Sequence, residues 1–176
     1  MAKAVATYVI RPFRESDAAD LAEITISAIH TLGARRYSPD QVKVWASRHP
    51  GPQRFLDRAS AGAVIFVAAN AQDAPVAYAL LERTEQADGR GAGHLDMLYC
   101  HPAHTRRGLA DELLGAAQAH AEVAAMARLY TEASELARPA FERAGYHVLH
   151  RRDFTIAGVA IHNYAMEKKL GQKRLN

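Results

Sequence analysis

The stretch from His94 to Ala121 constrains the fold of this chain more than any other part of the sequence. Its first half, Leu95 to Cys100, is apolar and strand-like, and Pro102 follows it. Gly108 and Ala110 then open a segment whose apolar residues recur at helical spacing. A helix start leaves its first N–H groups without partners and carries a partial positive charge. The strand, turn and helix therefore form a candidate pyrophosphate site.

The turn itself has the sequence Thr105-Arg106-Arg107-Gly108-Leu109-Ala110. It resembles the pyrophosphate loop of the GNAT superfamily of acyl-CoA-dependent N-acetyltransferases, which reads Gln or Arg, two residues, Gly, one residue, then Gly or Ala. Every position agrees in kind except Thr105, so one side-chain contact is in doubt while the backbone cradle is kept. The resemblance implies that residues 105–110 hold the pyrophosphate of acetyl-CoA. The alternative is a plain strand–helix–strand unit in which Gly108 serves packing.

Composition sets the class of protein. With 176 residues, 49% hydrophobic and 23% charged, the chain fits one globular domain over residues 1–176. We expect a cytoplasmic protein, because no segment is apolar enough to cross a bilayer and the N-terminus lacks a signal-peptide pattern. A single cysteine excludes an internal disulfide, and the nine histidines form no metal-binding motif, so we expect no metal. A net charge of +3 without basic runs argues against nucleic acid as a partner.

The rest of the chain alternates strand and helix patterns in one unit without repeats or linkers. The order is strand, helices, three strands, helix, strand, helix, two strands, which makes an α/β (α+β) fold with a mixed sheet of about seven strands. The strands around the central helix should run parallel. The expected strands are Val5–Arg11, Ala63–Ala69, Pro75–Glu82, Leu95–Cys100, Arg128–Glu132, His147–Ile156 and Val159–Lys168. The expected helices are Asp17–Ile29, one starting at Ser38-Pro39-Asp40, Gln53–Ala59, the helix after Gly108, and Glu135–Ala144. We expect Thr84–Gly93 to be a flexible connector.

This order is that of the GNAT fold, and further segments resemble the same family. They are IRPFRESDAADLAEI near the start, ELARPAFERAGY late in the chain and the closing GVAIHNYAMEKKL. Within the superfamily, YSPDQVKVWA and the tail look most like the bacterial YafP-type acetyltransferases. In the GNAT fold the strand before the pyrophosphate loop splays away from its parallel neighbour.

The resemblance assigns further residues to acetyl-CoA. The backbone of Leu98, Tyr99 and Cys100 is expected to pair with the pantetheine arm as an added strand would. Ser134 stands where the family often has Asn, so it either contacts the pantetheine or caps a helix. Phe141 stands where the family usually has the tyrosine that protonates the leaving thiolate, and it is expected to pack near the cofactor instead.

Acetyl transfer to an amine also needs a base, because a protonated alkylamine has a pKa near ~10.4 and no free lone pair. Asp96 is the leading candidate. On strand alternation it shares a face with His94, Leu98 and Cys100, and Glu82 on the preceding strand lies within reach. Asp96 and Glu82 can equally be rim carboxylates or salt-bridge partners, and His94 can be the base or a solvated residue.

The acid that protonates the thiolate must differ from the family's usual tyrosine. Tyr164 on the last strand is our candidate, with His162, Tyr130, Tyr99 or water as alternatives; a tyrosine on a strand can also simply pack. A covalent route through Cys100 with His101 as base is disfavoured, because neighbouring residues of a strand point to opposite faces.

We therefore expect an enzyme that binds acetyl-CoA and transfers its acetyl group to a primary amine by direct attack in a ternary complex. The acceptor is a small-molecule or peptide amine that the sequence does not identify, with Tyr37 and Trp45 either lining its pocket or in the core. The alternative is a GNAT-fold module that binds acyl-CoA as a sensor without catalysis. Exposed terminal strands could support a homodimer.

Overall fold

The computed structural model describes residues 7–85 and 91–171, and within them seven strands form one mixed sheet. Its strand order is β1-β2-β3-β4-β5-β7-β6, antiparallel throughout except between β4 and β5. The strands are β1 (Val9–Pro12), β2 (Val64–Ala69), β3 (Pro75–Glu85), β4 (Gly91–Cys100), β5 (Arg128–Ala133), β6 (His147–Ile156) and β7 (Val159–Lys169). The α-helices are α1 (Ala18–Thr31), α2 (Pro39–Ala46), α3 (Gln53–Ser60), α4 (Leu109–Val123) and α5 (Arg138–Arg143). The expected element order and the parallel pair are confirmed.

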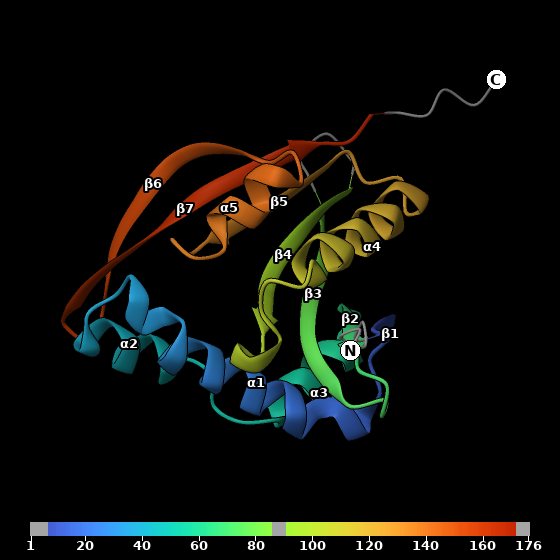
Figure 1. The fold of residues 1–176 in the computed structure, drawn as a ribbon. Coiled ribbons are helices and arrows are strands. Elements are labelled where there is room, and N and C mark those ends of the chain that lie inside the picture. Colours follow the sequence, from blue (N-terminus) through green and yellow to red (C-terminus); the bar gives the residue numbers. More distant parts are fainter. Residues whose placement is uncertain (1–6, 86–90, 172–176) are drawn as a thin grey trace, which may run out of the picture.

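Helices cover both faces of the sheet (Figure 1). On one face α4 and α5 bury Leu113 and Phe141 against β4 and β5. On the other face α1 and α3 bury Leu21 and Phe55 against β2, β3 and β4. Strands β3 and β4 in the middle of the sheet therefore lie between two apolar layers. Among the described residues, no helix has both the length and the apolar character that a membrane crossing requires.

The start of α2 follows the sequence prediction closely. Ser38 and Gln41 form a capping box, in which each side chain accepts a hydrogen bond from the other's backbone N–H, at 3.3 and 2.9 Å. Gln41 Nε2 also donates to the carbonyl of Ala160 on β7 at 2.9 Å. This bond fastens α2 to β7, and the Trp45 ring near the end of α2 lies 6.4 Å from the Tyr99 ring of β4, centroid to centroid.

The prediction that Thr84–Gly93 is a flexible connector is wrong for those of its residues that the structure describes. Strand β3 continues to Glu85 and β4 begins at Gly91, and these two residues pair in register. Small residues permit this pairing close to β5, because a Cβ on Gly93 would lie 2.5 Å from Leu129 Cδ2. The glycines serve close packing rather than flexibility. Gly89 and Arg90 lie outside the described residues.

Two other predicted boundaries move. The helix expected from Glu135 begins at Arg138, because residues 134–137 form a turn in which Ser134 Oγ accepts from Ala137 N at 3.2 Å. The first strand begins at Val9, where its pairing with β2 starts, rather than at Val5, which lies outside the described residues.

Candidate functional site

A gap opens between the two parallel strands at the centre of the sheet. Within the described residues, β4 and β5 pair only from Ala92 to His94. Beyond that point Thr131 Oγ1 donates to the carbonyl of Leu95 at 2.7 Å, and the strands separate. A largely apolar cavity of about 150 Å³ lies at this gap, lined by β4, the turn that follows β5, α1, α4 and α5. The splay expected from the family resemblance is present.

The edge of β4 that faces this gap carries unused backbone groups. His101 N donates to the carbonyl of Val76 on β3 at 2.8 Å. Because N–H groups alternate sides along a strand, those of Leu98 and Cys100 point away from β3 and toward the gap. An extended amide chain placed there would find the same hydrogen-bonding pattern as an added strand.

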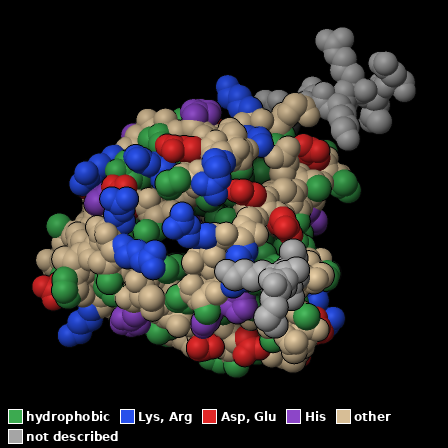
Figure 2. Space-filling model, in the orientation of Figure 1, with side chains coloured by type: hydrophobic (Ala, Val, Ile, Leu, Met, Phe, Trp, Pro, Cys, Tyr) green, Lys and Arg blue, Asp and Glu red, His purple; other side chains and the backbone are tan. Residues whose placement is uncertain are grey.

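The turn after β4 has the backbone geometry of an anion site. Arg106 and Gly108 have positive φ angles of 61° and 78°, while Arg107 between them does not. Such alternation turns successive N–H groups toward one point, and here that point lies at the N-terminus of α4. The Thr105 hydroxyl is already used, since it donates to the carbonyl of Pro102 at 3.2 Å. On the side of the molecule that Figure 2 shows, Lys and Arg side chains gather between α1 and α5.

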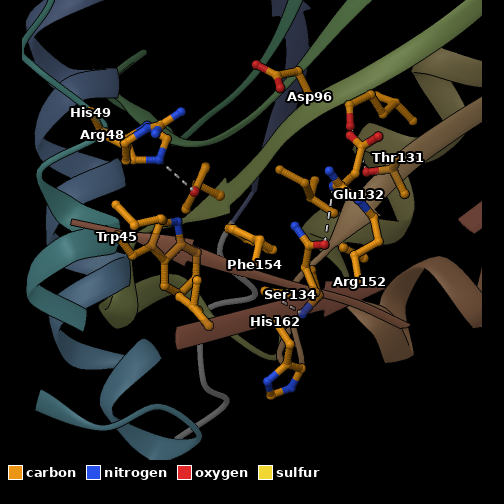
Figure 3. Close-up of a pocket in the computed structure, with 18 of the residues that line it drawn as sticks. Trp45, Arg48, His49, Asp96, Thr131, Glu132, Ser134, Arg152, Phe154 and His162 are labelled. Atoms are coloured by element: carbon orange, nitrogen blue, oxygen red, sulfur yellow. Dashed lines mark hydrogen bonds between the residues drawn. The ribbon is translucent and has the colours of Figure 1, made fainter. Parts of the chain in front are cut away.

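A second, larger cavity of about 970 Å³ adjoins the first, and Trp45, Leu98, Tyr99, Ser134 and Ala137 line both. Figure 3 shows its two walls: Trp45, Arg48 and His49 on the α2 side, and Thr131, Glu132, Ser134 and Arg152 opposite. Trp45 and Tyr37 thus belong to the lining, as does Phe141, which is fully buried against Tyr146.

Asp96 lies on the same strand face as His94, as strand alternation predicted, but not on the face of Leu98 and Cys100. Leu80 pairs with Met97 and Leu81 with Leu95, so Asp96 is the extra residue of a β-bulge. It keeps the side of His94 but not that of Leu98 and Cys100, because the bulge shifts the alternation by one residue. The bulge turns Asp96 toward α3.

Two arginines of α3 hold Asp96 in place. Arg58 Nη2 lies 2.8 Å from its carboxylate and Arg54 Nη2 lies 3.5 Å from it, and Arg58 Nε also bonds Glu82. Both carboxylates that the sequence suggested as bases are therefore engaged by guanidinium groups. This arrangement favours their reading as salt-bridge partners.

A different carboxylate, Glu132 on β5, points into the large cavity. His94 Nε2 lies 2.6 Å from Glu132 Oε2, and because an ionised carboxylate only accepts hydrogen bonds, the imidazole is the donor. The hydrogen bond from His94 holds the pKa of Glu132 below its ordinary value, against burial that would raise it. Burial, the largest effect, lowers the pKa of His94, but the hydrogen bond to Glu132 and the charges of Glu132, Asp96 and Glu82 together outweigh it, and the net shift is upward. The sequence prediction missed Glu132, although β4 and β5 were expected to be parallel neighbours.

Tyr164, the expected acid, lies apart from both cavity linings. Its hydroxyl donates to Glu135 Oε1 at 2.6 Å, and its ring lies under the Arg138 guanidinium, 4.6 Å from the ring centroid. His162 binds the same carboxylate oxygen at 2.8 Å. This cluster fastens the turn before α5 to β7.

A hydrogen-bonded aromatic group closes the wall opposite Glu132. Arg54 Nη1 donates to His49 Nδ1 at 2.9 Å, which leaves the proton of the neutral ring on Nε2, 3.4 Å from the Tyr99 hydroxyl. Burial, reinforced by the charge of Arg54, lowers the pKa of His49 to about 4. His49 is therefore neutral at pH 7, and the positive charge of this wall comes from its arginines.

Cys100 is a poor nucleophile in this setting. Burial raises the pKa of its thiol to about 11, and its Sγ lies 3.5 Å from the carbonyl of His101. The side chain packs against the apolar layer beneath α4. In the ranges 7–85 and 91–171 no three His, Cys, Asp or Glu side chains are grouped as metal ligands would be.

Comparison with known proteins finds similar sequences and similar structures. A family model described as an acetyltransferase (GNAT) domain matches residues 33–168. An uncharacterised N-acetyltransferase, YafP of Escherichia coli K12, is 29% identical over 160 residues, which cover 91% of this chain and 95% of YafP. A crystal structure of a GCN5-related N-acetyltransferase from Rhodopseudomonas palustris superposes with a TM-score of 0.80 at 30% identity, covering 97% of this chain and all of that one. The PaiA N-acetyltransferase of Thermoplasma acidophilum, solved with coenzyme A, has a TM-score of 0.73 at 17% identity, covering 93% and 99%.

Proposed function

This chain belongs to the GNAT acetyltransferase family, and from that premise we propose that it transfers an acetyl group from acetyl-CoA to a primary amine by direct attack in a ternary complex. The observation that carries the proposal is the continuity of the splayed β4–β5 gap with the cavity holding Glu132. A donor arm lying in the gap would end where an amine in the cavity could reach it. The donor supplies a thioester carbonyl, the electrophile of the reaction.

Residues of this chain offer contacts to the pyrophosphate and to the pantetheine arm of such a donor. The turn from Thr105 to Ala110 offers convergent backbone N–H groups and two arginines to the pyrophosphate. The N–H groups of Leu98 and Cys100 suit the amide groups of the pantetheine arm, or the oxyanion that forms when the carbonyl is attacked. Ser134 lines both cavities, and Phe141 lines the larger one.

We assign the role of base to Glu132 in place of Asp96. Its carboxylate takes one proton from the acceptor's ammonium group and later releases it to solvent. The neutral amine nitrogen then attacks the carbonyl carbon and forms the C–N bond. The nitrogen of this tetrahedral adduct loses its second proton to water, and the C–S bond breaks to release the thiolate. His94, which donates to Glu132 Oε2, positions the carboxylate and leaves Oε1 for the amine. A thiol pKa near ~8.5 makes the thiolate a stable leaving group, so water can protonate it and Tyr164 needs no role.

The test is release of free thiol from acetyl-CoA with a panel of primary amines. Amine-dependent thiol release, matched by acetylated amine in equal amount, is the expected result. Saturable acetyl-CoA binding without turnover for any amine would contradict the transferase and favour a non-catalytic acyl-CoA sensor. Phe141, which lacks the family's usual hydroxyl, is the residue that would then explain the loss.

A further inference from the structure

The lining of the large cavity holds four arginines against three carboxylates, Asp57, Asp96 and Glu132, and Asp57 accepts a hydrogen bond from Gln53 at 2.9 Å. Two of its guanidinium groups, Arg54 and Arg58, are engaged by Asp96, and Glu82 adds a second partner for Arg58. Glu132 is engaged by His94. The cavity's guanidinium groups belong to Arg48, Arg54, Arg58 and Arg152.

Among the described residues no carboxylate lies within salt-bridge distance of Arg48 or Arg152, although the charge of Arg152 contributes to the lowered pKa of Glu132. The Arg48 guanidinium also forms no hydrogen bond within those ranges, although its backbone carbonyl accepts from Arg54 at 3.0 Å. Arg152 donates a long bond of 3.3 Å to Asn163 Oδ1 and lies 5.7 Å from the centroid of the Phe154 ring. Both side chains thus reach the cavity with most of their donors unused.

The two arginines stand on either side of the space in front of Glu132. Figure 3 shows Arg152 beside Glu132 on one wall and Arg48 on the opposite wall, with Phe154 between them. A planar guanidinium binds carboxylate and phosphonate groups through two parallel hydrogen bonds. The anion and the amine of one small molecule could therefore be held together, the anion by arginine and the ammonium by Glu132.

We propose that the acceptor is a small amine that also carries an anionic group a few bonds away, as in an α-amino acid or its phosphonate analogue, and that Arg152 and Arg48 hold this group. The inference rests on the proposed function, since it assigns the acceptor of that same cavity. Trp45, Tyr99 and Phe154 would contact the acceptor's side chain. A neutral amine would leave both guanidinium groups without an anion in direct contact.

The first test compares amines that differ only by the anion. Each α-amino acid of a panel is paired with its decarboxylated amine, and selected phosphonate analogues form a third arm that separates carboxylate from phosphonate. We expect kcat/KM to be at least about tenfold higher for the anionic partner of the best pair, the size of one charge-assisted bond in a partly exposed site. Arg152→Gln or Arg48→Gln should reduce that ratio toward one, while Arg36→Gln, an exposed arginine outside both cavities, should retain it.

A binding measurement separates this inference from the proposed function. Trp45 is the single tryptophan of the chain and lines the cavity, so its fluorescence reports occupancy without turnover. If no amine is acetylated, the proposed function fails, yet tighter binding of leucine than of 3-methylbutylamine, lost in Arg152→Gln or Arg48→Gln, would still support the anion site. Equal kcat/KM and equal binding for acid and amine, or a preference unchanged in both variants, would overturn it.

Discussion

Replacing Glu132 by glutamine removes the proposed base and keeps its size and its ability to accept from His94. The amide cannot take the ammonium proton at pH 7, so attack depends on the small fraction of amine that is already neutral. General base catalysis contributes about 10²–10⁴ in rate. The Glu132 side chain is 32% exposed, which gives water partial access as a substitute base. We therefore expect the low end, a loss of about a hundredfold in kcat/KM, or ~2.7 kcal/mol of transition-state stabilisation.

The pH dependence sharpens this prediction. As pH rises toward the pKa of an alkylamine, near ~10.4, the neutral amine becomes abundant and the base becomes unnecessary. The deficit of the variant should therefore shrink as pH rises, while acetyl-CoA affinity stays unchanged. The assay is steady-state thiol release from pH 6.5 to 9.5 with one good amine, together with acetyl-CoA binding at each pH.

Asp96→Asn is the matched comparison, because Asp96 is also a carboxylate of the cavity but is held by Arg58 and Arg54. Asp96→Asn should lower the free energy of unfolding, and it should reduce kcat/KM much less than Glu132→Gln does. A Glu132→Gln enzyme with wild-type kcat/KM at pH 7, or an Asp96→Asn enzyme with the larger and pH-dependent loss, would refute the assignment of the base to Glu132.

Three further predictions concern neighbouring features. His94→Gln should lower the free energy of unfolding by about 1 kcal/mol at pH 6, a value discounted for partial exposure. Because the pKa of folded His94 is raised, the part of this stability that comes from its charge is full below ~6.5 and is lost as pH rises through the folded pKa. Urea unfolding at pH 9 should therefore show a smaller difference between variant and wild type. Gly93→Val should destabilise the fold by about 1–3 kcal/mol, since its Cβ would meet Leu129 Cδ2 at 2.5 Å, and a denaturation midpoint equal to wild type would contradict that packing. Cys100, with a thiol pKa of about 11, should react with iodoacetamide at pH 7.5 far more slowly in the folded protein than in urea; equal rates would show an accessible thiolate.

Much of the fold was predictable because its signals are local. The capping box at Ser38, the turn at Gly108 and the apolar strand runs each depend on a few neighbouring residues. The connector from Thr84 to Gly93 was mispredicted because glycine-rich sequence is typical of loops. Its role here is tertiary: Gly93 leaves the room that Leu129 fills from the neighbouring strand.

The strand, turn and helix that we propose to hold the cofactor were predictable for the same reason, since they are continuous in sequence. The arrangement of the proposed acceptor cavity was not, because its parts come from distant segments. A single bulge at Asp96 shifts strand alternation by one residue and turns that carboxylate toward Arg58, 38 residues earlier. Glu132 meets His94 across a parallel pair whose register the sequence does not specify.

The most direct test of the central claim is a calorimetric titration of the protein with acetyl-CoA, with dephospho-CoA and ATP as controls. Gly108→Glu is the critical variant: Gly108 has a φ of 78°, and a glutamate there would strain the turn and add negative charge where the pyrophosphate is expected. Gly108→Ala is its partner, because no atom lies within 4 Å of the added Cβ and strain alone is introduced. The account predicts saturable one-site binding by the wild type, weaker binding by Gly108→Ala and none by Gly108→Glu. Absence of binding by the wild type, or near-normal affinity in Gly108→Glu, would contradict it.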